Sequence, residues 1–254
     1  MKLATWNVNS LVARMPRVLD LLEQHQPDVL FMQETKTEPG AFPLLELEAA
    51  GYRAVHHSTG RWAGVALLAR GEVVEVRAGL PGEPSRDEAR WVEADVDGLR
   101  VVSVYVPNGR APHSPFYEDK LRFLDAMAER VGALASGPLV VAGDLNVCPT
   151  DIDVYDADAF IDATHVTPPE RARFQRLLDA GMVDAFRVLH PGEPGFTWWD
   201  YRQGHFHRDK GLRIDAILLS QPLADDLIEC GIDRDFRKGP KPSDHAPLLC
   251  TVAL

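Results

Sequence analysis

Two apolar segments flank an amphipathic one at the start of this chain, and this order constrains the fold more than any other feature. Residues 2–8 (KLATWNV) and 28–34 (DVLFMQE) have the length and the apolar content of buried strands. Between them, apolar residues recur with the spacing of one helix face, namely Val12, Val18, Leu19, Leu21 and Leu22. A strand, a helix and a strand in this order form a βαβ unit, in which the two strands are parallel. We therefore predict an α/β fold.

The remaining segments predict a second sheet and further helices. Strand-like segments with short turns follow at 52–57, 64–70, 73–78, 90–96 and 99–106, and later at 138–146, 196–200, 212–220 and 246–254. Helices are predicted near 115–135, which opens with a Ser-Pro pair, and over 168–181, which ends on a glycine. This mixture indicates two mixed sheets packed together with helices outside. Since no linker-like stretch divides the chain, we expect a single domain over 1–254.

The charge and the cysteines narrow the class of protein. A formal net charge of −11 argues against generic nucleic-acid binding, although acidic substrates could bind through local basic patches or a metal ion held by carboxylates. The three cysteines are widely spaced, which argues against a disulfide framework and favours a reducing, cytoplasmic setting. The sequence contains neither a signal-peptide pattern nor an apolar run long enough for a membrane span, so we expect no membrane partner.

Polar residues recur where the predicted apolar strands end. They are Asn7, Asn9, Glu34, Tyr105, Asn108, Asp144 and Asn146. In addition, Asp215 interrupts the apolar run 212–220, and Asp244 with His245 precedes the last strand. Singly, each has an ordinary explanation, such as a solvent-facing carboxylate, an Asx turn, a tethered core tyrosine or a structural histidine. Together at strand ends, where a sheet presents groups on a rigid frame, they indicate a functional site.

The chemistry of this set is that of a site for a hard cation. Carboxylate and amide oxygens suit Mg²⁺ or Mn²⁺, and the candidate ligands are Asn7, Glu34, Asp144, Asn146 and Asp244. Phosphate-ester hydrolysis needs a metal ion, a group that orients water, and donors to the phosphoryl oxygens. Histidine, tyrosine and asparagine side chains can be those donors. The sequence contains no zinc-spaced Cys/His cluster, Walker loop or nucleophile elbow.

A second cluster lies within 196–213 (FTWWDYRQGHFHRDKGLR). It interleaves aromatic residues with cations, namely Trp198, Trp199, Tyr201 and Phe206 with Arg202, Arg208, Lys210 and Arg213. Such rings stack on bases or sugars, and such cations contact phosphates. Alternatively, the segment is a hairpin whose rings pack in the core. Residues 237–241 (RKGPK) add positive charge nearby in the sequence.

Six motifs together resemble the bacterial exonuclease III family, within the deoxyribonuclease-I-like endonuclease/exonuclease/phosphatase superfamily. They are TWNVNSL, FMQETK, VYVPNG, VVAGDLNV, GLRIDAILLS and KPSDHAP, and the resemblance runs from residue 3 to about residue 253. It implies a four-layer α/β sandwich with the site at one mouth of the two sheets, holding one or two Mg²⁺ or Mn²⁺ ions. It also implies a monomeric DNA repair enzyme that acts on double-stranded DNA with abasic sites or blocked 3′ ends. The expected activities are cleavage 5′ to an abasic site, 3′→5′ exonuclease action, and removal of 3′ blocking groups as a phosphodiesterase or phosphatase.

The resemblance assigns roles to the strand-end residues. Glu34 would be the main metal ligand, with Asn7 nearby. Asp144 would orient or deprotonate the attacking water, and would also contact the metal. Asn146 would hold a phosphoryl oxygen or that water, and would count among the metal ligands. Tyr105 would act at the phosphate or the leaving group.

The adjacent pair Asp244 and His245 raises a separate question, because neighbouring residues on a strand point to opposite faces. The resemblance implies that His245 donates to the phosphate and is oriented by Asp215, which would explain an acid inside an apolar run. Asp244 would then face the metal, and His245 is a further possible ligand.

Five residues would contact the substrate: Asn108, Trp198, Arg202, Leu212 and Ile214. Of these, Trp198, Leu212 and Ile214 would line a pocket for the abasic sugar. Leu212 replaces a bulkier aromatic residue of some relatives, which would loosen the pocket and favour exonuclease action. Asn9 replaces an aspartate of some relatives, which would weaken or change the metal site. Two other functions stay open: a phosphoesterase of the same superfamily acting on RNA or a phosphoinositide, and a non-enzymatic DNA-binding relative.

Overall fold

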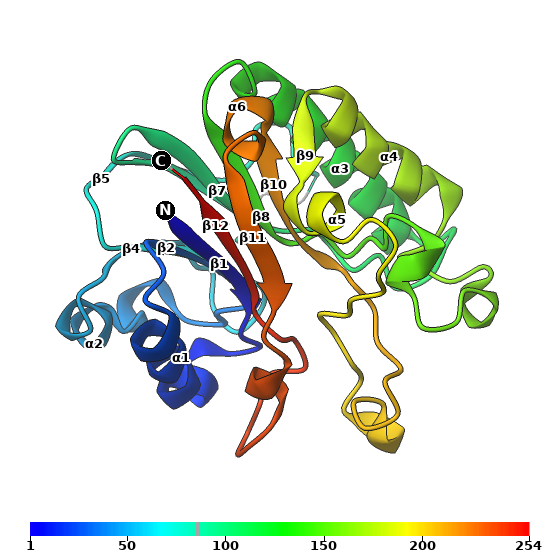
Figure 1. Cartoon of the computed structure of the whole chain (residues 1–254), viewed down its shortest axis with the longest axis horizontal. Coiled ribbons are helices and arrows are strands. Elements are labelled where there is room, and N and C mark those ends of the chain that lie inside the picture. The colour runs from blue at the N-terminus through cyan, green and yellow to red at the C-terminus, as the bar shows by residue number, and fades with distance from the viewer. Residues whose placement is uncertain (85–86, 254) are drawn as a thin grey trace.

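The computed structural model describes residues 1–84 and 87–253, which form two six-stranded sheets (Figure 1). The first sheet has the order β11-β12-β1-β2-β4-β3, with β1 (Lys2–Asn7), β2 (Val29–Gln33), β3 (Arg53–His57), β4 (Val65–Ala69), β11 (Leu227–Ile232) and β12 (Leu248–Val252). The second sheet has the order β5-β6-β7-β8-β10-β9, with β5 (Val73–Ala78), β6 (Trp91–Val96), β7 (Leu99–Tyr105), β8 (Leu139–Asp144), β9 (Met182–Asp184) and β10 (Asp215–Ser220). The helices are α1 (Leu11–His25), α2 (Leu44–Ala49), α3 (Pro115–Leu134), α4 (Pro168–Asp179), α5 (Ala185–Leu189) and α6 (Gln221–Ala224).

Each sheet contains one parallel pair at its centre. In the first sheet, β1 runs parallel to β2, as the predicted βαβ unit requires, and in the second sheet β7 runs parallel to β8. The other neighbouring strands are antiparallel. The prediction of two mixed sheets is therefore confirmed.

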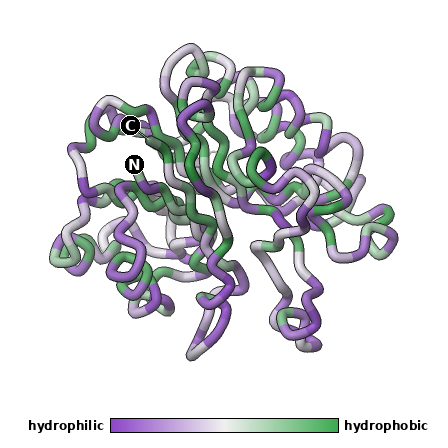
Figure 2. Tube along the Cα trace, viewed as in Figure 1, coloured by the Kyte–Doolittle hydropathy of each residue, from purple (hydrophilic) through white to green (hydrophobic). Residues whose placement is uncertain are grey.

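The apolar side chains separate into layers. A core between the sheets takes residues from both, including Phe31, Leu67, Val101, Val140 and Ile217. Residues of α1 cover the outer face of the first sheet, while α3 and α4 cover that of the second. Figure 2 shows the apolar colour along the strands and the polar colour along many of the connecting loops. The four-layer α/β sandwich is confirmed, and burial of both sheet faces explains why the central strands read as continuous apolar runs.

A buried polar contact crosses the apolar core close to the ends of the central strands. Gln33 Nε2 donates to Ser103 Oγ at 3.1 Å, and Thr5 Oγ1 donates to Gln33 Oε1 at 3.3 Å. This contact joins β1 and β2 of one sheet to β7 of the other. It lies one residue before Glu34, so it helps to fix the spacing of the sheets where they carry functional groups.

The structure differs from the predicted elements around 196–200. This segment forms no strand; Trp198 makes single bridges to Leu212 and to His245. The β-ladder does not continue because the backbone N–H groups of Ile214 and Asp215 donate to a side chain instead of a strand. Their acceptor is Thr197 Oγ1. The sequence patterns also missed α2, β9, α5, α6 and β11, which are short or exposed.

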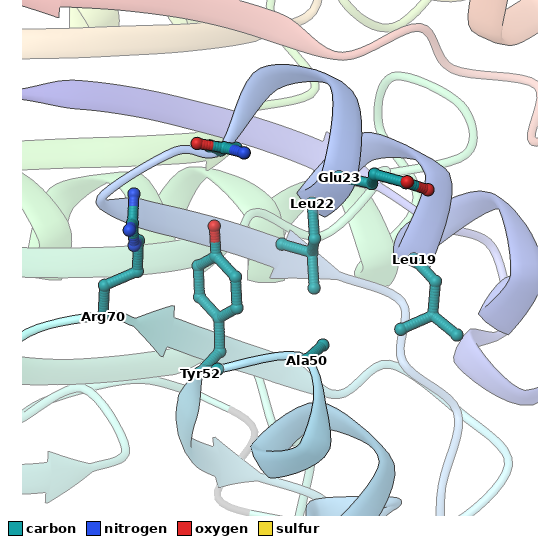
Figure 3. Close-up of a pocket in the computed structure, with 8 residues that line it drawn as sticks. Leu19, Leu22, Glu23, Ala50, Tyr52 and Arg70 are labelled. Atoms are coloured by element: carbon teal, nitrogen blue, oxygen red, sulfur yellow. The ribbon is translucent and has the colours of Figure 1, made fainter.

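One surface pocket lies away from the strand ends that carry the polar residues. It has a volume of about 440 Å³ and is lined by Leu19, Leu22, Tyr52 and Arg70, among others (Figure 3). The Tyr52 hydroxyl donates to the Pro27 carbonyl at 2.9 Å, so the ring is tethered. None of the site residues expected from the sequence lines this pocket. Within the described part of the chain, no helix is both long enough and apolar enough to cross a bilayer.

Candidate active site

The ends of four central strands meet at one mouth of the sandwich. Asn7 ends β1, Tyr105 ends β7 and Asp144 ends β8, while Glu34 directly follows β2. The parallel registers pair Asn7 with Gln33 and Tyr105 with Asp144. The Asn7 amide nitrogen also donates to Asp144 Oδ2 of the other sheet at 3.0 Å, so the two parallel pairs present their carboxyl ends at the same place.

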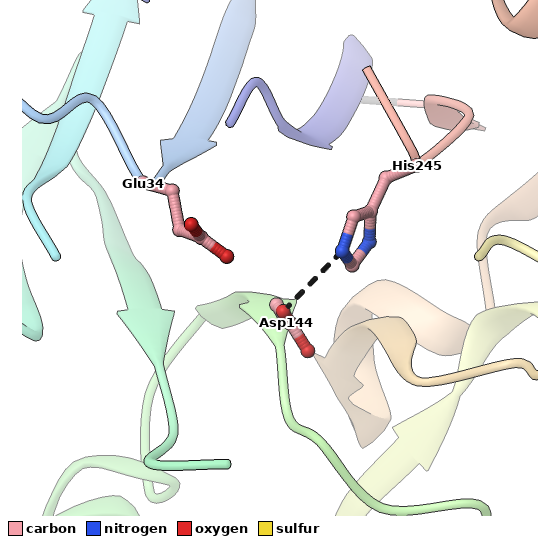
Figure 4. A group of neighbouring side chains, drawn as sticks. All are labelled: Glu34, Asp144 and His245. Atoms are coloured by element: carbon pink, nitrogen blue, oxygen red, sulfur yellow. Dashed lines mark ion pairs between the residues drawn. The ribbon is translucent and has the colours of Figure 1, made fainter. Parts of the chain in front are cut away.

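Three side chains at this mouth could hold a metal ion. One potential ligand atom each of Glu34, Asp144 and His245 lies within 4.8 Å of the other two (Figure 4). Asp144 and His245 are buried, and Glu34 is half-buried. Two carboxylates in a confined site create negative charge that a divalent cation neutralises, and carboxylate oxygens suit Mg²⁺ or Mn²⁺. The two carboxylates therefore fit the expected metal, whereas His245 could bind it only as a neutral imidazole.

Asn7 orients these carboxylates through hydrogen bonds from its amide group. Its amide nitrogen donates to Glu34 Oε1 at 2.9 Å and to Asp144 Oδ2 at 3.0 Å. Its amide oxygen accepts from the backbone N–H of Asn9 at 3.0 Å. An amide oxygen can accept a second partner, so the role of Asn7 as a metal ligand stays a prediction.

His245 is held by the carboxylate expected from the sequence. Its Nδ1 lies 2.8 Å from Asp215 Oδ2, and its Nε2 lies 3.7 Å from Asp144 Oδ2. Asp215 reaches this position because β10 pairs with β8 so that Asp215 lies opposite Asp144. The bond to Asp215 makes Nδ1 the donor, which directs Nε2 into the site.

The pKa values of His245 and Asp144 depend on each other. Burial by itself lowers the pKa of His245, but the Asp215 and Asp144 carboxylates outweigh it and raise that pKa to about 10. Burial also raises the pKa of Asp144 to about 7, against the lowering effect of His245. At neutral pH His245 is therefore a cationic donor, and Asp144 is a carboxyl whose proton affinity is unusually high.

The loop after β8 carries Asn146 beside Asp144. Asn146 has a left-handed backbone (φ 50°), and its backbone N–H donates to Asp144 Oδ1 at 3.0 Å. Its amide nitrogen donates to the Val106 carbonyl at 2.9 Å, and its amide oxygen accepts from Asn108 Nδ2 at 3.3 Å. Asn146 and Asn108 thus form one polar pair at the site. The role of Asn146 as a metal ligand stays a prediction.

The backbone of Glu34 adopts an uncommon conformation at this mouth of the sandwich. Glu34 has φ 51°, a left-handed conformation that is uncommon for residues other than glycine. Such conformations concentrate at functional sites, where the surrounding structure enforces them. In Glu34 the conformation turns the chain at the end of β2, where its side chain joins Asp144 and His245 (Figure 4).

Tyr105 lies against the carboxylates as a protonated phenol. Burial raises its pKa well above the ordinary value, and the negative charges of Glu34 and Asp144 raise it further. The guanidinium carbon of Arg90 lies 4.6 Å from the centre of the Tyr105 ring. Tyr105 can therefore donate a hydrogen bond into the site, which agrees with a role at the phosphate or the leaving group.

Asp244 is bonded to Asn9 and Trp198 beside the three-residue group. Its Oδ1 accepts from Asn9 Nδ2 and its Oδ2 from Trp198 Nε1, both at 3.0 Å. Asn9 in turn accepts from Lys36 Nζ at 2.7 Å, and Lys36 Nζ lies 2.6 Å from Glu34 Oε2. Both oxygens of Asp244 therefore belong to a polar chain that runs from Trp198 to Glu34, and the expectation that Asp244 faces the metal stays a prediction.

The expected substrate residues fall into three groups. Asn108 joins the site through Asn146, and Trp198 adjoins it through Asp244 and its bridge to His245. Leu212 and Ile214 are only 1% and 4% exposed, because they pack with Cys148 and Val154. They offer little free surface to a sugar in this structure. The side chain of Arg202 is 83% exposed and pairs with Asp200, so the structure does not bring it to the site.

The sequence patterns did not identify several residues near the site. A pocket of about 520 Å³ adjoins Glu34 and Tyr105 and is also lined by Trp62, Arg90 and Arg110. The Trp62 side chain is 72% exposed, which is unusual for the largest apolar side chain. A tryptophan beside Arg61 in a glycine-flanked turn (TGRWAG) was the available signal. Buried His165 was missed as well; burial, with Lys120 nearby, lowers its pKa to about 4.

Known proteins are similar to this sequence over nearly its whole length. The sequence profile of the Endonuclease/Exonuclease/phosphatase family matches residues 4–245. Exodeoxyribonuclease III of Haemophilus influenzae is 36% identical over 267 residues, covering 98% of both chains. DNA repair nuclease APEX1 of Danio rerio is 32% identical over 260 residues, covering 100% of this chain and 83% of that protein.

Solved structures agree with these sequence relationships. The 3′ phosphatase NExo from Neisseria, bound to a product DNA hairpin, has a TM-score of 0.98 and 39% identity, with 100% of both chains covered. An AP endonuclease from Archaeoglobus fulgidus has a TM-score of 0.97 and 35% identity, again with 100% of both chains covered. The resemblance to the exonuclease III family is confirmed, and the chain belongs to the endonuclease/exonuclease/phosphatase family.

Proposed function

We propose that this protein is a metal-dependent DNA repair nuclease, with one catalytic domain over residues 1–254. The observation that carries the proposal is the group of Glu34, Asp144 and His245 at the mouth of the two sheets, with Asp215 behind the histidine. This group combines a cation site with a charged donor, which is what phosphodiester hydrolysis requires. The relatives named as exodeoxyribonuclease III, AP endonuclease and 3′ phosphatase support DNA as the substrate.

Mg²⁺, or Mn²⁺ in its place, is the proposed cofactor, and Glu34 and Asp144 would hold one such ion. When bound, a divalent cation neutralises charge on the phosphoryl oxygens and makes water a better nucleophile. Asp144 would orient the attacking water and accept its proton, since its carboxylate lies within the three-residue group beside the proposed ion. Asn146 and Asn108 would hold that water or a phosphoryl oxygen.

The remaining groups supply hydrogen bonds to the phosphate. His245 would donate from Nε2, because Asp215 holds the ring in its charged form. Tyr105 would donate to the phosphate or to the leaving oxygen as a protonated phenol. Donors that are already oriented before the reaction stabilise the transition state more than the ground state.

Double-stranded DNA with abasic sites or blocked 3′ ends is the proposed substrate. The exposed Trp62 and the cations Arg90 and Arg110 line the pocket beside Glu34 and would contact bases and phosphates. Leu212 is already packed against neighbouring residues, which favours action at 3′ ends over accommodation of an abasic sugar. We further propose a monomer that works in the cytoplasm.

A panel of substrates tests the proposal. Cleavage is measured on a duplex with one abasic site, a plain duplex and a duplex with a 3′-phosphate, each with Mg²⁺, with Mn²⁺ and with EDTA. An RNA strand and an inositol phosphate represent the alternative function. We expect cation-dependent cleavage of the DNA substrates, with the 3′-end substrates turned over fastest. Faster hydrolysis of RNA or inositol phosphate than of any DNA would refute the proposal.

A further inference from the structure

Lys120 and Glu170 form an ion pair that is completely buried beneath the site. Lys120 belongs to α3 and Glu170 to α4, and both side chains are 0% exposed. Charged residues are almost never fully buried unless paired, and a buried pair often adds little to stability. Stability alone therefore does not explain why the Lys120 ammonium group is buried with these contacts.

The ammonium group joins two loops that carry site residues. Lys120 Nζ donates to the main-chain carbonyl of Asn146 at 2.7 Å and to that of Asn108 at 3.3 Å. Asn108 follows β7 and Asn146 follows β8. One buried cation thus contacts the backbone of both residues whose side chains form the polar pair at the site.

The backbone of Asn146 needs such support. Its left-handed conformation is sparsely populated, and residues held in this way depend on their surroundings. The Asn146 carbonyl also lies 2.7 Å from His165 Nδ1, which must be the donor because a carbonyl only accepts. Two donors therefore fix the plane of the peptide that follows Asn146.

Glu170 holds the cation in this position and ties in the neighbouring loop. Its Oε1 contacts Lys120 Nζ and accepts from Thr164 Oγ1 at 2.8 Å and from the backbone N–H of His165 at 3.0 Å. On the other side, a Cβ on Gly109 would lie 2.8 Å from Lys120 Cδ, so the backbone at Gly109 passes directly over the lysine chain. The lysine is packed from both sides.

We propose that Lys120 is a positioning residue for the hydrolytic reaction, with Glu170 as its counter-ion. The buried ammonium group sets the places of the Asn146 and Asn108 side chains relative to Asp144, through their main-chain carbonyls. A displacement of about 1 Å in such groups can lower a rate about 100-fold. This inference rests on the proposed role of Asn146 and Asn108 in holding water or a phosphoryl oxygen.

A charge-free replacement of the pair tests the inference. Lys120→Met/Glu170→Gln removes the donor without leaving a buried charge unpaired. We expect kcat on a 3′-phosphate duplex with Mg²⁺ to fall about 10- to 100-fold, with KM and Mg²⁺ affinity within about twofold of the wild-type values. Arg130→Met/Glu93→Gln is the matched control, because it removes an ion pair between the same helix and β6, away from the site. Its kcat should stay at the wild-type value.

Asn146→Ala, measured in parallel, separates failure of this inference from failure of the proposed function. A large loss of kcat in Asn146→Ala, together with a wild-type kcat in Lys120→Met/Glu170→Gln, would overturn the role of Lys120 and leave the proposed function intact. A wild-type kcat in Asn146→Ala would refute the role of Asn146 itself. If the first double variant does not fold, Lys120→Met/Glu170→Met, which places only apolar side chains in the contact, is judged by the same criteria.

Discussion

His245 Nδ1 lies 2.8 Å from Asp215 Oδ2, whereas the neighbouring Asp244 bonds to Asn9 and Trp198 instead. Two adjacent residues of the chain thus belong to two different polar networks. Irregular backbone around the bridge between Trp198 and His245 makes this possible. The histidine receives its carboxylate from β10, and that carboxylate keeps the ring charged.

Asp215→Asn should move the alkaline limit of activity to lower pH. The pKa of His245 is raised to about 10, so the ring is a charged donor up to that pH in the wild-type protein. Without the Asp215 carboxylate the pKa falls, and the charged form is lost as the pH rises through a lower value. We expect a fall in kcat/KM of about 10²-fold at pH 8 and a smaller one at pH 6. A pH–rate profile from pH 5.5 to 10 checks this, and an unchanged alkaline limit would contradict it.

Glu34→Gln should weaken cation binding. Glu34 contributes one of the two carboxylates in the three-residue group, and amide oxygens bind Mg²⁺ less strongly than carboxylates. We expect the Kd for Mn²⁺, measured by calorimetry without DNA, to rise at least about tenfold. Glu38→Gln, at an exposed position four residues later, is the matched control and should keep the wild-type Kd.

Trp62→Ala should raise KM much more than it lowers kcat. The exposed ring lines the pocket beside Glu34 and Tyr105 but does not belong to the group that performs hydrolysis. Loss of one stacking contact weakens binding by about 1–3 kcal/mol, which corresponds to an increase in KM of about 5- to 150-fold. Steady-state kinetics on a duplex with a recessed 3′ end gives both values. A fall in kcat at constant KM would mean that Trp62 does not act through binding.

Leu212→Trp should lower the ratio of exonuclease to abasic-site activity. Leu212 itself offers little free surface, and a larger ring at this position would add apolar surface for an abasic sugar. Because Leu212 is 1% exposed, the larger side chain also strains the packing, by about 1–3 kcal/mol of unfolding free energy. The ratio is therefore measured below the unfolding midpoint and compared with that of Leu212→Phe. A higher ratio in Leu212→Trp would contradict the proposed effect of the smaller residue.

The fold was predictable from sequence where periodicity dominates. The βαβ start and the polar ends of β1, β2 and β8 follow from apolar runs of strand length, and these determine where Asn7, Glu34 and Asp144 meet. Asp215 was recognisable because a carboxylate inside a buried strand needs a partner. These features depend on short stretches of sequence.

The remaining features depend on contacts between distant segments. The direction of Asp244 is decided by the Trp198 indole, 46 residues away in the sequence, and no local pattern contains that information. Lys120 looks like an ordinary helix residue until the loops after β7 and β8 fold over it. The orientation of Asn7, likewise, follows from three partners that only the packed sheets bring together.

Single-turnover cleavage by Asp144→Asn tests the central claim most directly. The variant keeps the shape of the buried side chain but removes the carboxylate that would orient and deprotonate water. With enzyme in excess over a 3′-phosphate duplex and saturating Mg²⁺, we expect the cleavage rate to fall at least about 10³-fold while the duplex still binds. Cleavage within about threefold of the wild-type rate would contradict the assignment of this site to DNA hydrolysis.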